Sequence, residues 1–271
     1  MKLIKKFTLQ LRNKPWLISL VLIMLLAVIL RFINVPDRYT FDGDAVTDAV
    51  VAYMSVKQLQ LPITGNFSAA GSFTFGPWYF YHLILFYALT HLAAGVWIVN
   101  GILSVVTVLV LYYLGKEIQD EKLGLIMAFL AAITPAQNAI ASSSSNPNIV
   151  VLYSALTFLG LIKILRQKHT SLLWAGVIGI CIGIAINAHY QALLLLIIPW
   201  YLLFFSPDQK VKRFLGSLLG IFLTFLPLLF FNLTNHWHTL RNFIYYSLHG
   251  RGLIYVPNSW TIYLRDFWPE V

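Results

Sequence analysis

The chain carries very little charge. Only 11% of its 271 residues are charged, whereas 59% are hydrophobic. A soluble domain has about 25% charged residues, so the composition excludes an ordinary soluble protein. Cysteine is almost absent, and the single Cys181 excludes both an internal disulfide and a zinc site built from several cysteines. Glycine-rich phosphate-binding patterns are missing too, so nothing indicates nucleotide binding.

What the chain has in their place is a series of long apolar runs. A helix needs about 20 apolar residues to cross a bilayer. The runs predict an all-α polytopic membrane protein with seven transmembrane helices. The predicted spans are 15–34, 95–115, 123–142, 148–166, 172–188, 190–206 and 214–231.

Basic residues give the expected orientation. Residues 1–14 are basic and contain no acid, which predicts a cytoplasmic N-terminus followed by an uncleaved anchor. The basic segments 166–169 and 210–213 should lie on the same side. If seven helices cross a plasma membrane and these basic segments are all inside, the loop 35–94 and the segment 232–271 must lie outside.

A shorter run at 77–92 is rich in tryptophan and tyrosine, which favour the membrane interface. This orientation requires that the run 77–92 does not cross the membrane. We therefore interpret it as the second of two juxtamembrane helices in a long first external loop, the first being expected at about 45–60. The alternative is an ordinary short span, which would place the later basic loops outside.

Three aspartates follow the first span within seven positions: Asp42, Asp44 and Asp48. A carboxylate beside a bilayer is costly, so it is a functional candidate. In a helix over 45–60, Asp44 would lie near the N-terminus and Asp48 one turn further on the same face. Capping of that helix is the structural alternative. We expect Asp44 to be catalytic, with Asp42 or Asp48 as a helper.

Cations and polar side chains gather at the same outer ends of the spans. Arg31 could snorkel to the headgroups or bind a phosphate, and we expect it to bind a substrate phosphate with Arg38 and Arg241. No metal-ligand spacing such as HExxH occurs, so the sequence predicts no metal site. The expected substrate-binding residues are Tyr79, Asn146, Asn148 and His189.

The order of these motifs resembles a known family. Residues 44–49, 76–81, 146–148 and 187–190 follow the order of the seven-span module of the glycosyltransferase C superfamily. Within it, the chain is most similar to the branch of protein O-mannosyltransferases and aminoarabinose transferases. Each motif is loose, and their order is the specific part.

The resemblance implies a polyprenyl-phosphate sugar as donor, used on the outer face, with an acidic residue of the first external loop at the reaction centre. Asp44 occupies the matching position. Members often carry further acids where this chain has Phe75 and the turn 142–148. No cofactor is therefore firmly implied, and a role for a divalent metal stays open. The family also has further C-terminal spans, so we expect the chain to be truncated at Val271.

The predicted function is a membrane glycosyltransferase. The donor brings a good leaving group, so one carboxylate base, Asp44, suffices for an inverting displacement by an acceptor hydroxyl. The expected partners are the lipid donor, membrane lipid and an acceptor glycan, lipid or protein, with no nucleic acid. The alternatives are a transporter or flippase of a lipid-linked or anionic substrate, and an inactive scaffold subunit. Transporters usually place polar groups near the midplane, whereas here polarity gathers at the outer ends.

Overall fold

The computed structural model describes residues 15–38, 43–68, 71–92, 94–166 and 172–249. Within these ranges the chain is helical apart from turns, loops and one isolated bridge between Phe67 and Thr74. The all-α prediction is therefore confirmed for the described residues. The expected segments 1–14 and 250–271, as well as Asp42, lie outside them.

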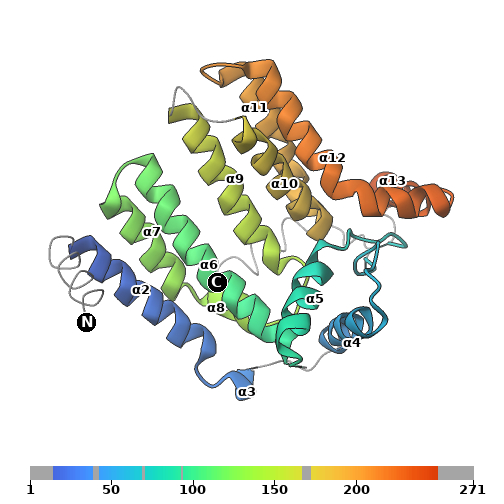
Figure 1. The fold of residues 1–271 in the computed structure, drawn as a ribbon, viewed down its shortest axis with the longest axis horizontal. Coiled ribbons are helices and arrows are strands. Elements are labelled where there is room, and N and C mark those ends of the chain that lie inside the picture. Colours follow the sequence, from blue (N-terminus) through green and yellow to red (C-terminus); the bar gives the residue numbers. More distant parts are fainter. Residues whose placement is uncertain (1–14, 39–42, 69–70, 93, 167–171, 250–271) are drawn as a thin grey trace.

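The helices form an inclined bundle with shorter helices at one end (Figure 1). Chain order, including the 3₁₀ helix η1, is α2 (Pro15–Phe32), α3 (Val35–Arg38), α4 (Gly43–Gln58), α5 (Trp78–Thr90), α6 (Gly95–Ile118), α7 (Glu121–Ile133), α8 (Pro135–Ser142), α9 (Asn148–Arg166), α10 (Leu173–Ala188), η1 (Tyr190–Leu196), α11 (Ile197–Phe205), α12 (Lys210–Thr234) and α13 (His238–His249).

Each of the seven apolar runs forms helix, but not each is long enough to cross. Among the described residues, four helices have the length and hydropathy of a membrane span: α2, α6, α9 and α12. The pair α7 and α8 makes a fifth if it is counted as one bent span. The remaining two runs, α10 and Tyr190–Phe205, are apolar but shorter. The protein is thus an integral membrane protein, and the number seven stays a prediction.

The span expected at 123–142 is not continuous. It divides into α7 and α8, which are bent by 57°. The cause is Pro135, the first residue of α8, because proline has no N–H and disfavours helical geometry at the residue before it. Thr134 accordingly has an extended ψ of 123°.

Close helix packing depends on small residues. At Gly179 of α10, a Cβ atom would lie 2.0 Å from the Ser217 carbonyl oxygen of α12. At Gly220 of α12, it would lie 2.3 Å from the Gly176 carbonyl oxygen. Small residues let membrane helices approach closely where no hydrophobic driving force acts between them. These glycines therefore hold α10 and α12 together.

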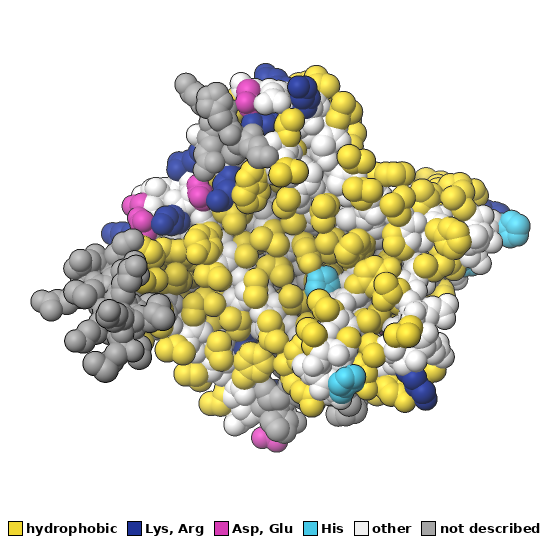
Figure 2. Space-filling model, in the orientation of Figure 1, with side chains coloured by type: hydrophobic (Ala, Val, Ile, Leu, Met, Phe, Trp, Pro, Cys, Tyr) yellow, Lys and Arg dark blue, Asp and Glu magenta, His cyan; other side chains and the backbone are white. Residues whose placement is uncertain are grey.

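Charged side chains gather at one end of the bundle, here called the basic end. Lys116 pairs with Glu121 at 3.2 Å, joining α6 to α7. Lys163 of α9 pairs with Glu117 at 3.4 Å. Arg213 and Asp208 form a third pair at the start of α12. Figure 2 shows these charge types along one edge of a face that is otherwise mostly hydrophobic.

The opposite end holds α3, α4, α5, α8 and α13 (Figure 1), and it is here called the aspartate end. Helix α5 has 13 residues, or ~20 Å at 1.5 Å per residue. That length falls short of the roughly 30 Å hydrocarbon core. Helix α4 buries Ala45, Asp48 and Ala52 and leaves Val46 and Val50 exposed. Both helices lie close to the predicted ranges 45–60 and 77–92, and their juxtamembrane, external placement remains a prediction.

Candidate active site at the aspartate end

Asp48 lies at the centre of a buried polar cluster. Its side chain is 0% exposed. The Ser144 hydroxyl donates to Oδ2 at 2.8 Å, and the Asn66 amide donates to Oδ1 at 3.2 Å. The three residues come from α4, the turn after α8 and the loop between α4 and α5. The carboxylate therefore joins segments that are far apart in the sequence.

A second set of polar groups supports Ser144. Its Oγ lies 2.9 Å from the Tyr79 hydroxyl, and the Asn100 amide lies 3.3 Å from that hydroxyl. Because Ser144 donates to Asp48, Tyr79 must donate to Ser144 and Asn100 to Tyr79. All three side chains are buried. The hydrogen bonds thus form a chain of donors directed at one carboxylate.

Burial and the neighbouring groups shift the pKa values of Asp48 and Tyr79. Burial raises the pKa of Asp48, and the nearby negative charge of Asp44 raises it further. The hydrogen bonds from Ser144, Asn66 and Tyr79 lower that pKa in part. Burial also raises the pKa of Tyr79, so its phenol stays a hydrogen-bond donor. Asp48 consequently retains a proton more readily than an ordinary aspartate.

Asp44 has the opposite environment from Asp48. It lies in the first turn of α4, one turn before Asp48, and its side chain is exposed. Asp48 lies with Ala45 and Ala52 on the buried face of α4, whereas Asp44 lies in the first turn, at the end of the helix. Of these two aspartates of α4, Asp44 is therefore the one accessible from the surface.

The three arginines expected at a donor phosphate lie in different environments. Arg31 is 1% exposed, and its guanidinium donates to Ser104 and to the carbonyls of Ala131 and Ala132. Arg38 donates to the carbonyls of Leu30 and Asn138. Arg241 of α13 is exposed. A phosphate at this end could therefore reach Arg241 without breaking the contacts of a buried arginine.

The expected substrate-binding residues are mostly engaged in the fold. Tyr79 belongs to the buried Asp48 cluster. The amide of Asn146 donates to the Ala188 carbonyl, and the amide of Asn148 donates to the Ser143 carbonyl at 3.0 Å. His189 is half-buried and stacks on Phe75 with ring centroids 5.1 Å apart. Unlike the buried ring of Tyr79, the ring of His189 is partly exposed.

The loop between α4 and α5 forms a short strap, described at residues 65–68 and 71–76, across this end. The Gly65 N–H donates to the Phe75 carbonyl at 2.8 Å, and the Gly76 N–H donates to the Asn187 carbonyl at 2.8 Å. A Cβ atom at Gly76 would lie 1.7 Å from Asn187 Oδ1, so only glycine allows this approach. Thr74 of the strap bonds Thr239 of α13 at 3.0 Å. The strap thus connects the Asp48 cluster to α13.

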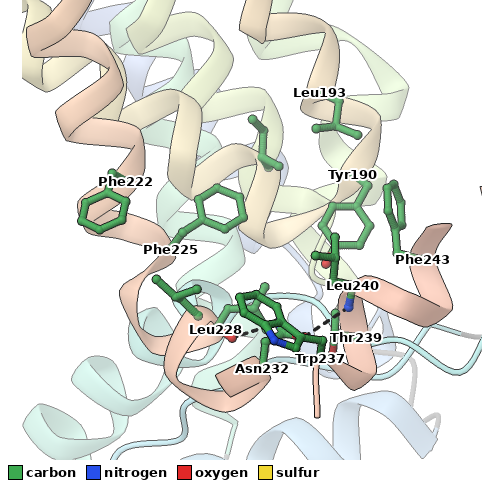
Figure 3. Close-up of a pocket in the computed structure, with 12 residues that line it drawn as sticks. Tyr190, Leu193, Phe222, Phe225, Leu228, Asn232, Trp237, Thr239, Leu240 and Phe243 are labelled. Carbon is green, nitrogen blue, oxygen red and sulfur yellow. Dashed lines mark hydrogen bonds between the residues drawn. The ribbon is translucent and has the colours of Figure 1, made fainter. Parts of the chain in front are cut away.

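An apolar groove opens beside α13 (Figure 3). It comprises a cavity of about 380 Å³ and a neighbouring cavity of about 320 Å³. Both are lined by Ile186, Leu193, Phe222 and Phe225, so they adjoin along α12. Asn232 lies at the α13 end, where its Oδ1 accepts the Leu240 N–H at 3.2 Å. The groove therefore offers an almost purely hydrocarbon lining that ends near polar groups.

Whether the described residues could form a metal centre depends on the side chains that they bring together. No group of three or more histidine, cysteine, aspartate or glutamate side chains lies close enough within them to hold a metal ion. The Asp48 oxygens accept from the Ser144 hydroxyl and the Asn66 amide, which are hydrogen-bond donors and not further carboxylate or imidazole ligands. We therefore assign no catalytic step to a metal.

Sequence reasoning identified the turn 142–148 without singling out Ser144, and it missed Asn66 and Asn100. Asn66 and Ser144 are 18 and 96 residues from Asp48, and nothing local in the sequence links them to it. Asn100 gave a usable signal, because a polar side chain within an apolar run usually faces the protein interior and marks a pathway or site. A buried asparagine near the end of a span could therefore have been added to the candidates.

The fold and the site define a class: an integral membrane protein whose polar chemistry is gathered at one end of an apolar helical bundle. Solved structures of the Archaeoglobus fulgidus oligosaccharyltransferase share this fold. A complex of that protein, AglB, with an inhibitory peptide and a dolichol-phosphate has a TM-score of 0.61 and 18% identity, over 80% of this chain and 30% of that chain. A complex with Zn and sulfate has a TM-score of 0.62 and 18% identity, over 77% and 31%.

The chain therefore spans less than a third of the length of these two structures. No curated protein matches it. The family model described as dolichyl-phosphate-mannose-protein mannosyltransferase matches residues 75–231, more than half of the chain. The chain belongs to this family, which lies within the glycosyltransferase C superfamily, as the order of its motifs predicted. The family is one of membrane glycosyltransferases that use a lipid-linked sugar.

Proposed function

We propose that the chain transfers a sugar from a polyprenyl-phosphate donor to an acceptor hydroxyl at the aspartate end, which faces the outside of the plasma membrane while the N-terminus is cytoplasmic. The observation that carries the proposal is the contrast within α4. Asp44 is exposed where a substrate can reach it, and Asp48 is buried one turn away, where it accepts hydrogen bonds from Ser144 and Asn66. Family membership supplies the donor class.

The reaction is a displacement at the anomeric carbon. The acceptor oxygen forms a bond to that carbon, and the bond from the carbon to the phosphate oxygen breaks. The acceptor proton passes to Asp44, which acts as general base. The polyprenyl phosphate leaves with the bonding electron pair. Attack opposite the leaving group inverts the anomeric centre, as in other reactions with a single displacement.

Other residues bind the two ends of the donor in this scheme. The apolar groove beside α12 takes part of the prenyl chain, because its lining is almost entirely hydrocarbon. Arg241, exposed on α13 next to the groove residue Leu240, stabilises the departing phosphate. His189 and the turn around Asn146 and Asn148 contribute to binding the sugar or the acceptor. The acceptor is a glycan, a lipid or a protein.

The first test is a transfer assay with the purified chain in lipid vesicles. Radiolabelled polyprenyl-phosphate sugars and a membrane acceptor extract are supplied to wild type, Asp44→Asn and Asp37→Asn. Asp37 is the control, because it is another exposed carboxylate at the same end. Loss of a general base lowers the rate by about 10²–10⁴, so Asp44→Asn should lose transfer and Asp37→Asn should retain it.

Two results would contradict the proposal. Transfer by Asp44→Asn at the wild-type rate would remove Asp44 from the base role. Passage of the labelled donor across the vesicle bilayer, without transfer, would favour the transporter alternative. Both results are read from the same vesicles, by recovering label from the acceptor and from each leaflet.

A further inference from the structure

Helix α7 ends in a buried environment, because Ala131 and Ala132 are 8% and 0% exposed. In a continuous helix the Ala131 carbonyl would accept from the N–H of residue 135. That residue is Pro135, which has no N–H. An unpaired carbonyl within a bilayer is costly and must be satisfied by the protein. The break between α7 and α8 therefore needs a donor from elsewhere.

Arg31 of α2 supplies that donor. Its Nη2 donates to the Ala131 carbonyl at 3.1 Å, and its Nη1 donates to the Ala132 carbonyl at 3.1 Å. Its Nε donates to the Ser104 hydroxyl at 2.8 Å. The planar fork of a guanidinium suits such paired acceptors, and a positive charge is favourable at a helix C-terminus. Arg31 thus joins the end of α7 to α2 and α6, because Nη1 also donates to the Ala27 carbonyl at 3.3 Å.

Ser104 and Arg38 extend these hydrogen bonds to the backbone of α8. Ser104, which accepts from Arg31, donates to the Gln137 carbonyl at 3.3 Å. Arg38 donates from Nη2 to the Asn138 carbonyl at 2.9 Å and from Nη1 to the Leu30 carbonyl at 2.6 Å. The α2–α3 segment therefore contacts both sides of the bend.

The direction of the bend decides where the active-site turn lies. Helix α8 ends at Ser142, and two residues later Ser144 donates to Asp48. We propose that Arg31 is a positioning residue: its guanidinium holds the α7–α8 bend and thereby places Ser144 against the Asp48 carboxylate. This inference rests on the proposed function for its kinetic consequence only, since the geometry can be measured separately.

Positioning and phosphate binding predict different kinetics for Arg31. A phosphate-binding residue would change the KM for the donor. A positioning residue would change kcat, because Ser144 holds Asp48 of α4, the helix that also carries Asp44, and a displacement of about 1 Å at the reacting groups can cost roughly 100-fold in rate. We expect R31M to lose about 100-fold in kcat with an unchanged donor KM. R31K should regain only part of the loss, because an ammonium cannot reproduce the guanidinium fork.

Arg213 provides the matched control. It is the other fully buried arginine of the described residues, and it lies at the basic end. R213M removes the same charge and the same bulk far from Asp48, so it should lower the melting temperature but leave kcat per folded molecule unchanged. Equal kinetic effects of R31M and R213M would overturn the proposal.

The double variant R31M/P135A separates positioning from simple carbonyl pairing. Replacing Pro135 by alanine returns the missing N–H, so the double variant should fold even where R31M does not. The straightened helix should nevertheless leave Ser144 displaced, and transfer should stay low. Recovery of wild-type kcat in the double variant would overturn the proposal.

Spin labels give a readout that does not depend on activity. Labels at the exposed positions Val50 of α4 and Ala139 of α8 are introduced by V50C and A139C, with the buried Cys181 replaced by alanine. The label distance should change in the R31M background and stay unchanged in R213M. An unchanged distance in R31M would overturn the positioning role whether or not wild type transfers sugar. Absence of transfer by wild type would refute only the proposed function.

Discussion

The two ends of the bundle surround their charged side chains with different partners. At the basic end, carboxylates and cations meet in pairs such as Lys163 with Glu117, and most of these side chains are partly exposed. At the aspartate end, Asp48 is fully buried and is held by the neutral groups of Ser144 and Asn66. Exposed ion pairs contribute little to stability, whereas a buried carboxylate depends on each of its donors. The aspartate end should therefore be far more sensitive to substitution.

The largest stability effect should separate the two aspartates of α4. Asp48→Leu leaves the donors of Ser144 and Asn66 buried without an acceptor, which costs about 3 kcal/mol of unfolding free energy. Asp44→Leu alters an exposed side chain and should stay within about 0.5 kcal/mol. Chemical denaturation in mild detergent measures both variants. Equal losses would show that the burial of Asp48 does not determine its contribution to the free energy of unfolding.

The pH dependence of stability should also separate the two ends. The pKa of Asp48 is raised by burial, so the folded state binds its proton more tightly than the unfolded state does. Stability from this group is therefore present below the ordinary carboxyl pKa near 4 and is lost as pH rises through the raised pKa. The melting-temperature advantage of wild type over Asp48→Asn should shrink over that window. A constant or widening difference would contradict the direction of the shift.

Removing one donor should have a smaller effect than removing the carboxylate. Ser144→Ala deletes the hydroxyl bonded to Asp48 Oδ2, at a cost of about 1–2 kcal/mol. It should also raise the Asp48 pKa further, because that bond favours the charged form. Ser145→Ala is the control, since its hydroxyl is not bonded to the carboxylate. Thermal unfolding at several pH values would reveal both changes, and indistinguishable curves for the two variants would argue against the cluster.

The smallest effect is expected at the basic end. Lys163→Met removes the partner of Glu117 at partly exposed positions. Such pairs contribute about 0.2–1 kcal/mol, and added salt screens them. Unfolding in low and high salt would measure the difference. A loss as large as that of Asp48→Leu would erase the contrast between the two ends.

Much of the helical framework could be predicted from hydropathy. The seven apolar runs all form helix, since length and composition alone favour it. Helices α4 and α5 also fall close to the predicted 45–60 and 77–92. The bend at Pro135 was not predicted, because a proline in a membrane helix can be accommodated without a break. Its direction depends on contacts with α2 and α6, which no local pattern encodes.

The candidate site was predicted only in part. The acidic stretch identified α4, yet the spacing of Asp44 and Asp48 did not show which of them is buried. That choice depends on the face of α4 that packs on α5, where Ala45 and Ala52 flank Asp48. Arg31 was expected to snorkel or to bind phosphate, and neither expectation anticipated unpaired carbonyls at a helix break. Long-range partners such as Asn66 could not be read from one sequence.

The most direct test of the account compares Asp44→Asn with Asp48→Asn in one transfer assay and one thermal unfolding series. The account predicts that Asp44→Asn loses at least about 100-fold in kcat and keeps the wild-type melting temperature. It predicts that Asp48→Asn melts at a lower temperature under acidic conditions and keeps most of its transfer per folded molecule. An inactive Asp48→Asn beside an active Asp44→Asn would contradict the account and would make the buried aspartate the base.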